Sequence, residues 1–229
     1  MSMYQDGKYL EHNPDWHAAD APFKARWIDN ILSENKIVTN SIVEIGCGSG
    51  EILVELMARR PAVRFAGYDI SLDAYNIFRS KEAPGLSFHH QNLFEVVPES
   101  TDVLLVIDVF EHVENYMGFI QATKTLATYK VFHIPLDLSV QGLLRGTALQ
   151  NARRIVGHLH YFCKDTALAT LRDCGLEVIA WNYTHGAEAL PNRQLRTKIL
   201  NFPRKLLRMV NEDFGVRLLG GASLMVLTQ

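Results

Sequence analysis

Short runs of apolar residues alternate with helix-length amphipathic segments over residues 22–135. Continuous Val, Ile and Leu runs are typical of strands that a parallel sheet buries on both faces, and helices between such strands are typical of βαβ units. The predicted strands are Ser41–Cys47, Val63–Ile70, Leu86–His90, Asp102–Asp108 and Lys130–Pro135. The predicted helices are Pro22–Leu32, Glu51–Arg60, Leu72–Ser80 and Tyr116–Thr128. This order predicts an α/β, doubly wound core.

The pattern becomes less regular after residue 136. Asp165–Cys174 is predicted to be helical, and Leu176–Tyr183 and Ser223–Thr228 to be strands. The segment 184–221 is too long for an ordinary loop, and 137–162 has no strand pattern, so we predict that both are helical cover insertions. We predict a single domain over residues 1–229, with residues 1–21 as an N-terminal arm.

Composition and charge exclude several classes of protein. A formal net charge of −2 argues against the basic surface of a nucleic-acid-binding protein. The longest apolar run, Val103–Ile107, is far shorter than a membrane-spanning helix, and the first 16 residues lack the apolar region of a signal peptide. Three cysteines without paired spacing fit a reducing compartment. We therefore expect a cytoplasmic protein with no transmembrane segment and no nucleic-acid partner.

The most informative stretch is Glu44-Ile45-Gly46-Cys47-Gly48-Ser49-Gly50, in which a predicted strand runs into glycines and then into a helix. Glycine permits the tight turn and lets a ligand approach main-chain atoms. Asp69 ends the next strand, where a carboxylate can accept hydrogen bonds from both ribose hydroxyls. Asn92 follows the third strand, where it can read an adenine edge, and Asp108 closes the fourth. These side chains converge on one crevice at the carboxyl edge of the sheet.

With these residues the chain resembles the class I S-adenosylmethionine-dependent methyltransferases. The family's first motif, an acidic residue followed by Gly-x-Gly-x-Gly, stands at Glu44, Gly46, Gly48 and Gly50. The run Asp108–Val113 looks like the D-V-x-E-H-V element of the broad small-molecule branch of the family.

The resemblance implies a Rossmann-like, seven-stranded sheet that is mostly parallel with an antiparallel last strand. It also implies S-adenosylmethionine as cofactor and S-adenosylhomocysteine as product. The cofactor-binding residues that it implies are Glu44, Gly46, Cys47, Gly48, Gly50, Asp69, Ile70, Asn92, Leu93 and Asp108.

Two other functions are compatible with the same fold. One is a catalytically silent protein that binds S-adenosylmethionine or adenosylhomocysteine. The other is an NAD-dependent dehydrogenase, but its Gly-x-Gly-x-x-Gly motif would have its last glycine at Glu51, whose carboxylate would repel a pyrophosphate. The fourth strand does not continue as Asn or Asp-Pro-Pro-Tyr, the family's signature for amino groups of nucleic acids and proteins. We therefore expect a small-molecule acceptor, with O-methylation favoured.

Methyl transfer needs a base only if the acceptor carries a proton, and histidine has a suitable pKa. His112 follows the fourth strand, and His133 lies near the end of the fifth. These two histidines are therefore the candidate catalytic residues, and the alternative for each is a structural imidazole. His158 and His160 share a face of an extended segment, but two histidines without a third ligand or a nearby carboxylate make a poor metal site. We therefore predict no metal.

The segment Ala189–Asn211 is basic and amphipathic. It holds no acidic residue and six basic ones: Arg193, Arg196, Lys198, Arg204, Lys205 and Arg208. Such a pattern is compatible with an anionic acceptor, with contact to an acidic membrane surface through 193–208, or with a cover whose charges are simply solvated. We predict that 137–162 and 184–221 cover the active site. The identity of the acceptor and the oligomeric state are left open.

Overall fold

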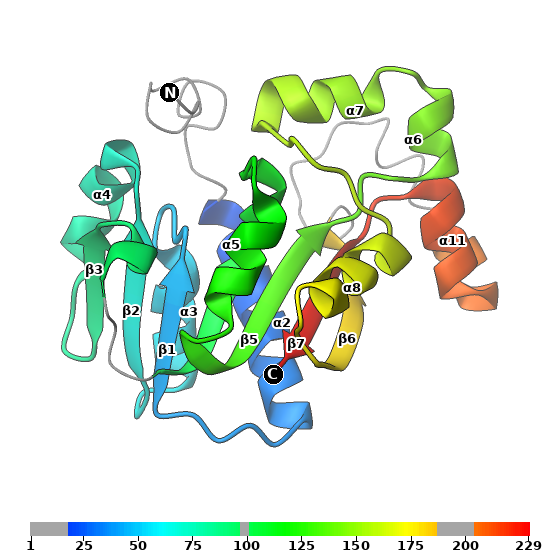
Figure 1. Ribbon diagram of the computed structural model, residues 1–229. Helices are drawn as coiled ribbons and strands as arrows, with labels where there is room; N and C mark the ends of the chain where they lie inside the picture. The colour runs from blue at the N-terminus through cyan, green and yellow to red at the C-terminus, as the bar shows by residue number, and fades with distance from the viewer. Residues whose placement is uncertain (1–17, 97–100, 187–203) are drawn as a thin grey trace.

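The computed structural model describes residues 18–96, 101–186 and 204–229. Among them, seven strands form one sheet in the order β3-β2-β1-β4-β5-β7-β6 (Figure 1). The strands are β1 Ser41–Ile45, β2 Arg64–Asp69, β3 Leu86–His90, β4 Thr101–Ile107, β5 Ala127–Pro135, β6 Val178–Thr184 and β7 Ser223–Thr228. Strands β1 to β5 are parallel, and β7 runs antiparallel between β5 and β6. The predicted fold class is confirmed.

Helices cover both faces of the sheet because successive strand residues point to opposite sides. Ile42 and Leu105 face a core formed with α2 Ala21–Glu34, α3 Glu51–Arg59 and α4 Leu72–Phe78. Val43 and Leu104 face a second core formed with α5 Tyr116–Thr123, α8 Lys164–Asp173 and α11 Glu212–Leu219. In Figure 1, α5 and α8 lie in front of the sheet and α2 lies behind it.

Short helices occupy the connections. They are η1 Ala18–Asp20, η2 Arg79–Lys81, η3 Leu93–Glu95, η4 Phe110–His112, α6 Val140–Leu144, α7 Ala148–Asn151 and the π-helix η5 Ala152–Val156. Figure 1 shows α6 and α7 at the top, beyond the arrowhead of β5. The segment 137–162 is therefore helical over much of its length and lies at the carboxyl edge of the sheet.

One predicted boundary is wrong by several residues. The helix predicted over Tyr116–Thr128 ends at Thr123, and the following strand begins at Ala127 instead of Lys130. The cause is strand pairing, because Ala127 pairs with Thr101 of β4 at the edge of the buried sheet. The other predicted ends lie within a few residues of the observed ones.

The basic segment is only partly described. Arg193, Arg196 and Lys198 lie outside the described residues, as do residues 1–17 of the predicted arm. The segment 204–210 is helical, and Arg204 at its start is 9% exposed and donates to the Leu219 carbonyl at 3.0 and 3.3 Å. Arg204 therefore does not belong to a solvated basic face. None of the helices in the described ranges has the length and apolar character needed to span a lipid bilayer.

A carboxylate connects the helical cover to the sheet. Asp213 of α11 accepts hydrogen bonds from the Tyr183 hydroxyl of β6 at 2.7 Å and from Arg217 Nε at 2.6 Å, and it also pairs with Lys164 of α8. We expect Asp213→Asn to lower the free energy of unfolding by about 1–2 kcal/mol in urea denaturation. This loss is smaller than the sum expected for three separate hydrogen bonds, because the Asp213 side chain is 36% exposed.

The neighbouring Glu212 provides the control. Its side chain is 51% exposed and pairs with His185 alone among the contacts of the described chain, at 2.9 Å. Glu212→Gln is expected to change the free energy of unfolding by less than about 0.5 kcal/mol. Equal losses of unfolding free energy in the two variants would show that the contacts of Asp213 do not stabilise the packing of α11 against the sheet.

Candidate active site

The turn from β1 into α3 requires glycine at several positions. Gly46, Gly48 and Gly50 have φ angles of +70°, +53° and +75°, in the left-handed region that favours glycine. A Cβ on Gly46 would also lie 2.8 Å from Val109 Cγ2, and one on Gly50 would lie 2.7 Å from the Phe88 ring. The predicted glycine turn is therefore fixed by backbone geometry and by close packing together.

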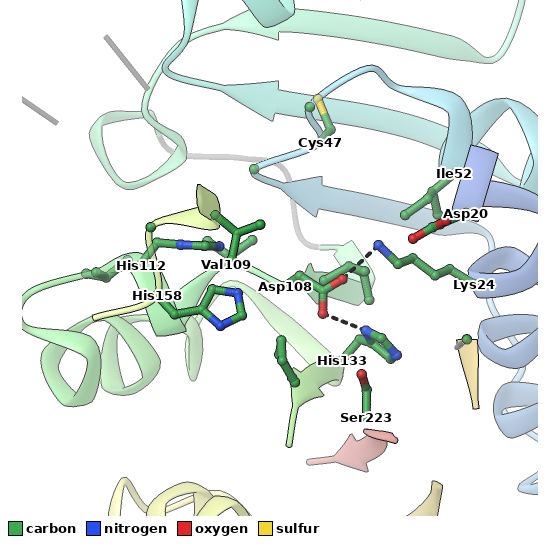
Figure 2. Close-up of a pocket in the computed structure, with 18 of the residues that line it drawn as sticks. Asp20, Lys24, Cys47, Ile52, Asp108, Val109, His112, His133, His158 and Ser223 are labelled. Carbon is green, nitrogen blue, oxygen red and sulfur yellow. Dashed lines mark hydrogen bonds and ion pairs between the residues drawn. The ribbon is translucent and has the colours of Figure 1, made fainter. Parts of the chain in front are cut away.

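A cavity of about 1520 Å³ opens at the carboxyl ends of the strands, beside the point between β1 and β4 where the strand order reverses (Figure 2). Its volume exceeds the roughly 300–1,000 Å³ of an ordinary ligand pocket, so it has room for two ligands. The predicted site residues that line it are Glu44, Gly46, Cys47, Gly48, Asp69, Ile70, Asp108, His112 and His133.

Three predicted cofactor residues do not line this cavity. Asn92 lines a smaller neighbouring pocket of about 380 Å³, which it shares with Ile70, and its side-chain oxygen accepts from the Phe94 N–H at 3.2 Å. Leu93 is 1% exposed and packs in the core, and Gly50 is the N-cap residue just before α3. Ile70 lines both pockets, so the two are neighbours.

Two buried carboxylates lie on the β1–β2 side of the cavity. Glu44 is 1% exposed, and its Oε2 has no hydrogen-bond partner among the described residues. Burial raises the pKa of Glu44 well above its usual range. Asp69 accepts the Gly48 N–H at 2.9 Å and the Ser71 N–H at 2.8 Å, one on each oxygen. A carboxylate has about four lone-pair sites, so Asp69 can still accept two hydroxyls.

A charged network stands in the centre of the cavity (Figure 2). Asp108, with φ at +54°, pairs with Lys24 Nζ at 2.7 Å and with His133 Nδ1 at 2.6 Å, one through each oxygen. The second ring nitrogen of His133 hydrogen-bonds the Thr184 hydroxyl at 2.8 Å. Burial alone would raise the pKa of Asp108, but His133 and Lys24 hold it well below its usual range.

The sequence did not indicate Lys24 or Thr184. Lys24 comes from α2 and Thr184 from the end of β6, and no local motif connects either residue with Asp108. Asp137 was also missed, although it lines the cavity just past the end of β5. The rule that singled out Asp69 and Asp108, a carboxylate at the end of a strand, would have found Asp137.

The opposite wall carries a second group of titratable side chains. His112 ends η4 and lies with its ring centroid 5.0 Å from that of His158 (Figure 2). Burial and the neighbouring His158 lower the pKa of His112 to about 4, so its imidazole is neutral at pH 7. Burial and the charge of Asp108 raise the pKa of Glu111, the residue before His112, well above its usual range.

Comparison with known protein families identifies the family of this chain. A methyltransferase-domain family model matches residues 9–180. The chain belongs to this family. It is an S-adenosylmethionine-dependent methyltransferase, as the resemblance implied. No curated protein matches the sequence of this methyltransferase.

Solved structures with the same fold belong to enzymes with different activities. Magnesium protoporphyrin IX methyltransferase from Synechocystis PCC 6803, with bound adenosylhomocysteine, has a TM-score of 0.60 at 13% identity, over 90% of this chain and 82% of the other. N-methyltransferase NodS from Bradyrhizobium japonicum WM9, also with adenosylhomocysteine, has a TM-score of 0.58 at 15% identity, over 96% of each chain. The cyclopropane synthase MmaA2 from Mycobacterium tuberculosis has a TM-score of 0.59 at 14% identity, over 88% and 82%. At such identities the likeness establishes the fold alone.

The β1–β2 side of the cavity fits the cofactor of the family. The unsatisfied oxygen of buried Glu44 calls for a hydrogen-bond donor, which the ammonium group of a methionine moiety supplies. Asp69 retains acceptor capacity for ribose, and the glycine turn presents bare backbone beside them. The donor set contains no cluster of arginines or lysines of the kind that would select a pyrophosphate, among the described residues that line the cavity.

Proposed function

We propose that this methyltransferase transfers the methyl group to an oxygen of a small-molecule acceptor. The observation that carries the proposal is that a single cavity has buried carboxylates and a glycine turn on one side and two histidines on the other. Its volume of about 1520 Å³ accommodates a cofactor and an acceptor together. An anionic acceptor is supported by Arg153, which lines the cavity, whereas Lys24 is already paired with Asp108.

In this proposal the cofactor lies along β1 and β2. The backbone of Gly46, Cys47 and Gly48 follows the amino-acid portion, Glu44 accepts from its ammonium group, and Asp69 binds the ribose. Ile70 and Asn92 border the adenine through the neighbouring pocket, and Leu93 packs in the core beside Asn92. Gly50 contributes by permitting the turn. Asp108 contributes by holding Lys24 and His133 in place, because both of its oxygens are engaged.

The acceptor lies on the side of His112 and His133. S-adenosylmethionine, when bound, supplies a methyl group on a positively charged sulfur. The neutral imidazole of His112 can take up the proton that an acceptor hydroxyl loses. His133 is fixed at both ring nitrogens, so we assign it to orienting the acceptor.

The helical insertions complete the acceptor side. Arg153 and Val156 of η5 line the cavity, as does Asp20 from the N-terminal arm. We propose that 137–162 and 184–221 cover the reacting groups and exclude water. A cytoplasmic location is part of the proposal and is supported by three free cysteines, Cys47, Cys163 and Cys174.

The direct test of the proposal is release of adenosylhomocysteine by the purified protein. S-adenosylmethionine is supplied with a panel of phenols, quinone-derived hydroxyl compounds, sugars, fatty acids and, for comparison, amines. We expect release with at least one hydroxyl or carboxylate compound and a methyl group on its oxygen by mass spectrometry. Release with amines alone would overturn O-methylation, and no release with any acceptor would favour the catalytically silent alternative.

The cofactor site has its own prediction. Asp69→Ala removes charge-assisted hydrogen bonds of roughly 1.5–3 kcal/mol, so adenosylhomocysteine should bind about 10- to 100-fold more weakly in calorimetry. Asp73→Ala, a carboxylate change on α4 that does not line the cavity, is the control and should leave the affinity unchanged. Unchanged affinity in Asp69→Ala would remove the ribose assignment.

A further inference from the structure

Glu111, His112 and His158 form a compact cluster on the acceptor side of the cavity. One ligand atom from each lies within 4.8 Å of the others. The first two residues end η4, whereas His158 comes from the segment that follows η5. The backbone fixes the two segments together, because the Leu159 and His160 N–H groups donate to the Glu111 carbonyl at 2.8 and 3.1 Å. The cluster is therefore built by the fold.

The Glu111 carboxyl group has no hydrogen-bond partner among the described residues. Its side chain is 1% exposed, and both of its oxygens are buried without a hydrogen bond among the described residues. Buried polar groups are nearly always satisfied, so two unsatisfied oxygens on one side chain call for an explanation. His112 Nε2 approaches Glu111 Oε1 at 3.8 Å, too far for a hydrogen bond. A cation between these groups would supply the missing partner.

His158 is arranged as histidine ligands of metals usually are. Its Nδ1 lies 2.6 Å from Asp137 Oδ2, so we assign the Nδ1 proton to this hydrogen bond. The Nε2 atom then carries the lone pair that can bind a metal ion. Carboxylates behind ligating histidines fix the tautomer and the ring orientation. Asp137 is thus a positioning residue.

We propose that Glu111, His112 and His158 bind one divalent first-row transition-metal ion, of the kind represented by Zn²⁺ or Mn²⁺. Two imidazoles and one carboxylate favour such ions over Mg²⁺ and Ca²⁺, which prefer oxygen ligands. Metal–ligand bonds of about 2.1 Å allow two ligand atoms to lie at most about 4.2 Å apart, and the 3.8 Å between His112 Nε2 and Glu111 Oε1 lies within this limit.

The site differs from the expectation of no metal, which rested on His158 and His160 lacking a third ligand or a nearby carboxylate. In the structure His158 groups instead with His112 and Glu111, and Asp137 is the carboxylate that contacts it. Three protein ligands leave coordination positions open for an acceptor oxygen, whose hydroxyl the ion would acidify. This role rests on the proposed function and would replace proton uptake by His112, because a bound ion would occupy the lone pair of its imidazole. Binding of the ion does not rest on the proposed function.

The test uses Co²⁺ alone, without cofactor or acceptor, because its d–d absorption reports coordination. Titration of the full chain is expected to show one bound Co²⁺, and Zn²⁺ but not Mg²⁺ should displace it. Glu111→Gln and His158→Ala should each weaken Co²⁺ binding by at least about 100-fold, and Asp137→Asn by about 10- to 100-fold. His185→Gln is the control, because His185 pairs with Glu212 and does not line the cavity.

Two results would overturn the proposal. One is the absence of saturable Co²⁺ binding in the wild-type chain, and the other is equal affinity in the wild type, Glu111→Gln and His158→Ala. Adenosylhomocysteine binding checks the fold of each variant, and His158→Ala carries the test alone if Glu111→Gln does not fold. Co²⁺ binding without any methyl transfer would leave the metal site standing and remove the proposed function. Methyl transfer without Co²⁺ binding would leave the proposed function standing and remove the metal site.

Discussion

The His112→Ala variant is expected to turn over its acceptor about 10²–10⁴ times more slowly than the wild type, which is the usual contribution of a positioned proton acceptor. His112 lines the cavity opposite the glycine turn, so its loss should leave adenosylhomocysteine affinity within about twofold of the wild type. Steady-state kinetics with the acceptor identified in the screen, combined with calorimetry, measures both quantities.

The matched control is His89→Ala. The His89 ring stacks on Tyr68 at 4.7 Å and does not line the cavity, so turnover should change little. Parallel losses of turnover and cofactor affinity in His112→Ala would make His112 a structural residue, and full activity would eliminate it. Co²⁺ titration of the same variant separates two roles, because a metal ligand loses the ion together with turnover, whereas a base loses turnover alone.

The Asp108→Ala variant is expected to lose about 3–5 kcal/mol of unfolding free energy, the range for removing one partner of a buried ion pair. Lys24 and His133 have side chains that are 14% and 5% exposed, and both would lose their carboxylate. Alanine would also have to adopt the left-handed backbone of Asp108, at φ +54°. Urea denaturation followed by circular dichroism gives the difference.

Asp29→Ala provides a comparison at matched exposure. Asp29 is 26% exposed and pairs with Arg60 at 2.7 Å, whereas Asp108 is 24% exposed. The Asp29 change should cost about 1 kcal/mol or less because Arg60 keeps its hydrogen bonds to the Asp29 carbonyl at 3.2 Å and to the Ser33 hydroxyl at 2.7 Å. Losses of similar size would mean that the central network contributes no more than the pair of Asp29 and Arg60.

The pH dependence of the Asp108 effect has a definite sign. The pKa of Asp108 is lower in the folded protein than in the unfolded chain, so its contribution is present above the unfolded value of about 3.9 and is lost as the pH falls further. The difference in stability between wild type and Asp108→Ala should therefore shrink as the pH falls below about 3.9. A difference that grows in acid would assign the stabilisation to another group.

Local patterns in the sequence predicted the parts of the site that depend on neighbouring residues. The glycine turn was predictable because Gly46 and Gly48 follow a strand directly, and Asp69 because it ends the next one. The sheet was predictable because buried strands are apolar on both faces. The end of the α5 helix at Thr123 was not, because it is set by pairing of the following strand with β4.

The acceptor side was harder to predict because its contacts join distant segments. The ion pair between Lys24 and Asp108 joins an N-terminal helix to the end of a central strand, and His158 meets Glu111 and Asp137 only after the chain has folded back over the sheet. Residue types and their spacing along the chain do not predict such contacts between distant segments. These contacts therefore had to be found in three dimensions.

The position of β7 between β5 and β6 has a consequence for folding during biosynthesis. Strand β6 ends at Thr184 but has its pairing partner in a strand that begins only at Ser223. At roughly 5–20 residues per second, the ribosome needs about 2–8 s to make the intervening segment. Throughout that interval β1 to β5 can assemble as a parallel sheet, while the exposed edge of β5 and the unpaired β6 wait for the same strand. We therefore expect the nascent chain to pass through a five-stranded sheet with a vacant β5 edge and a separate, unpaired β6, until β7 pairs with both.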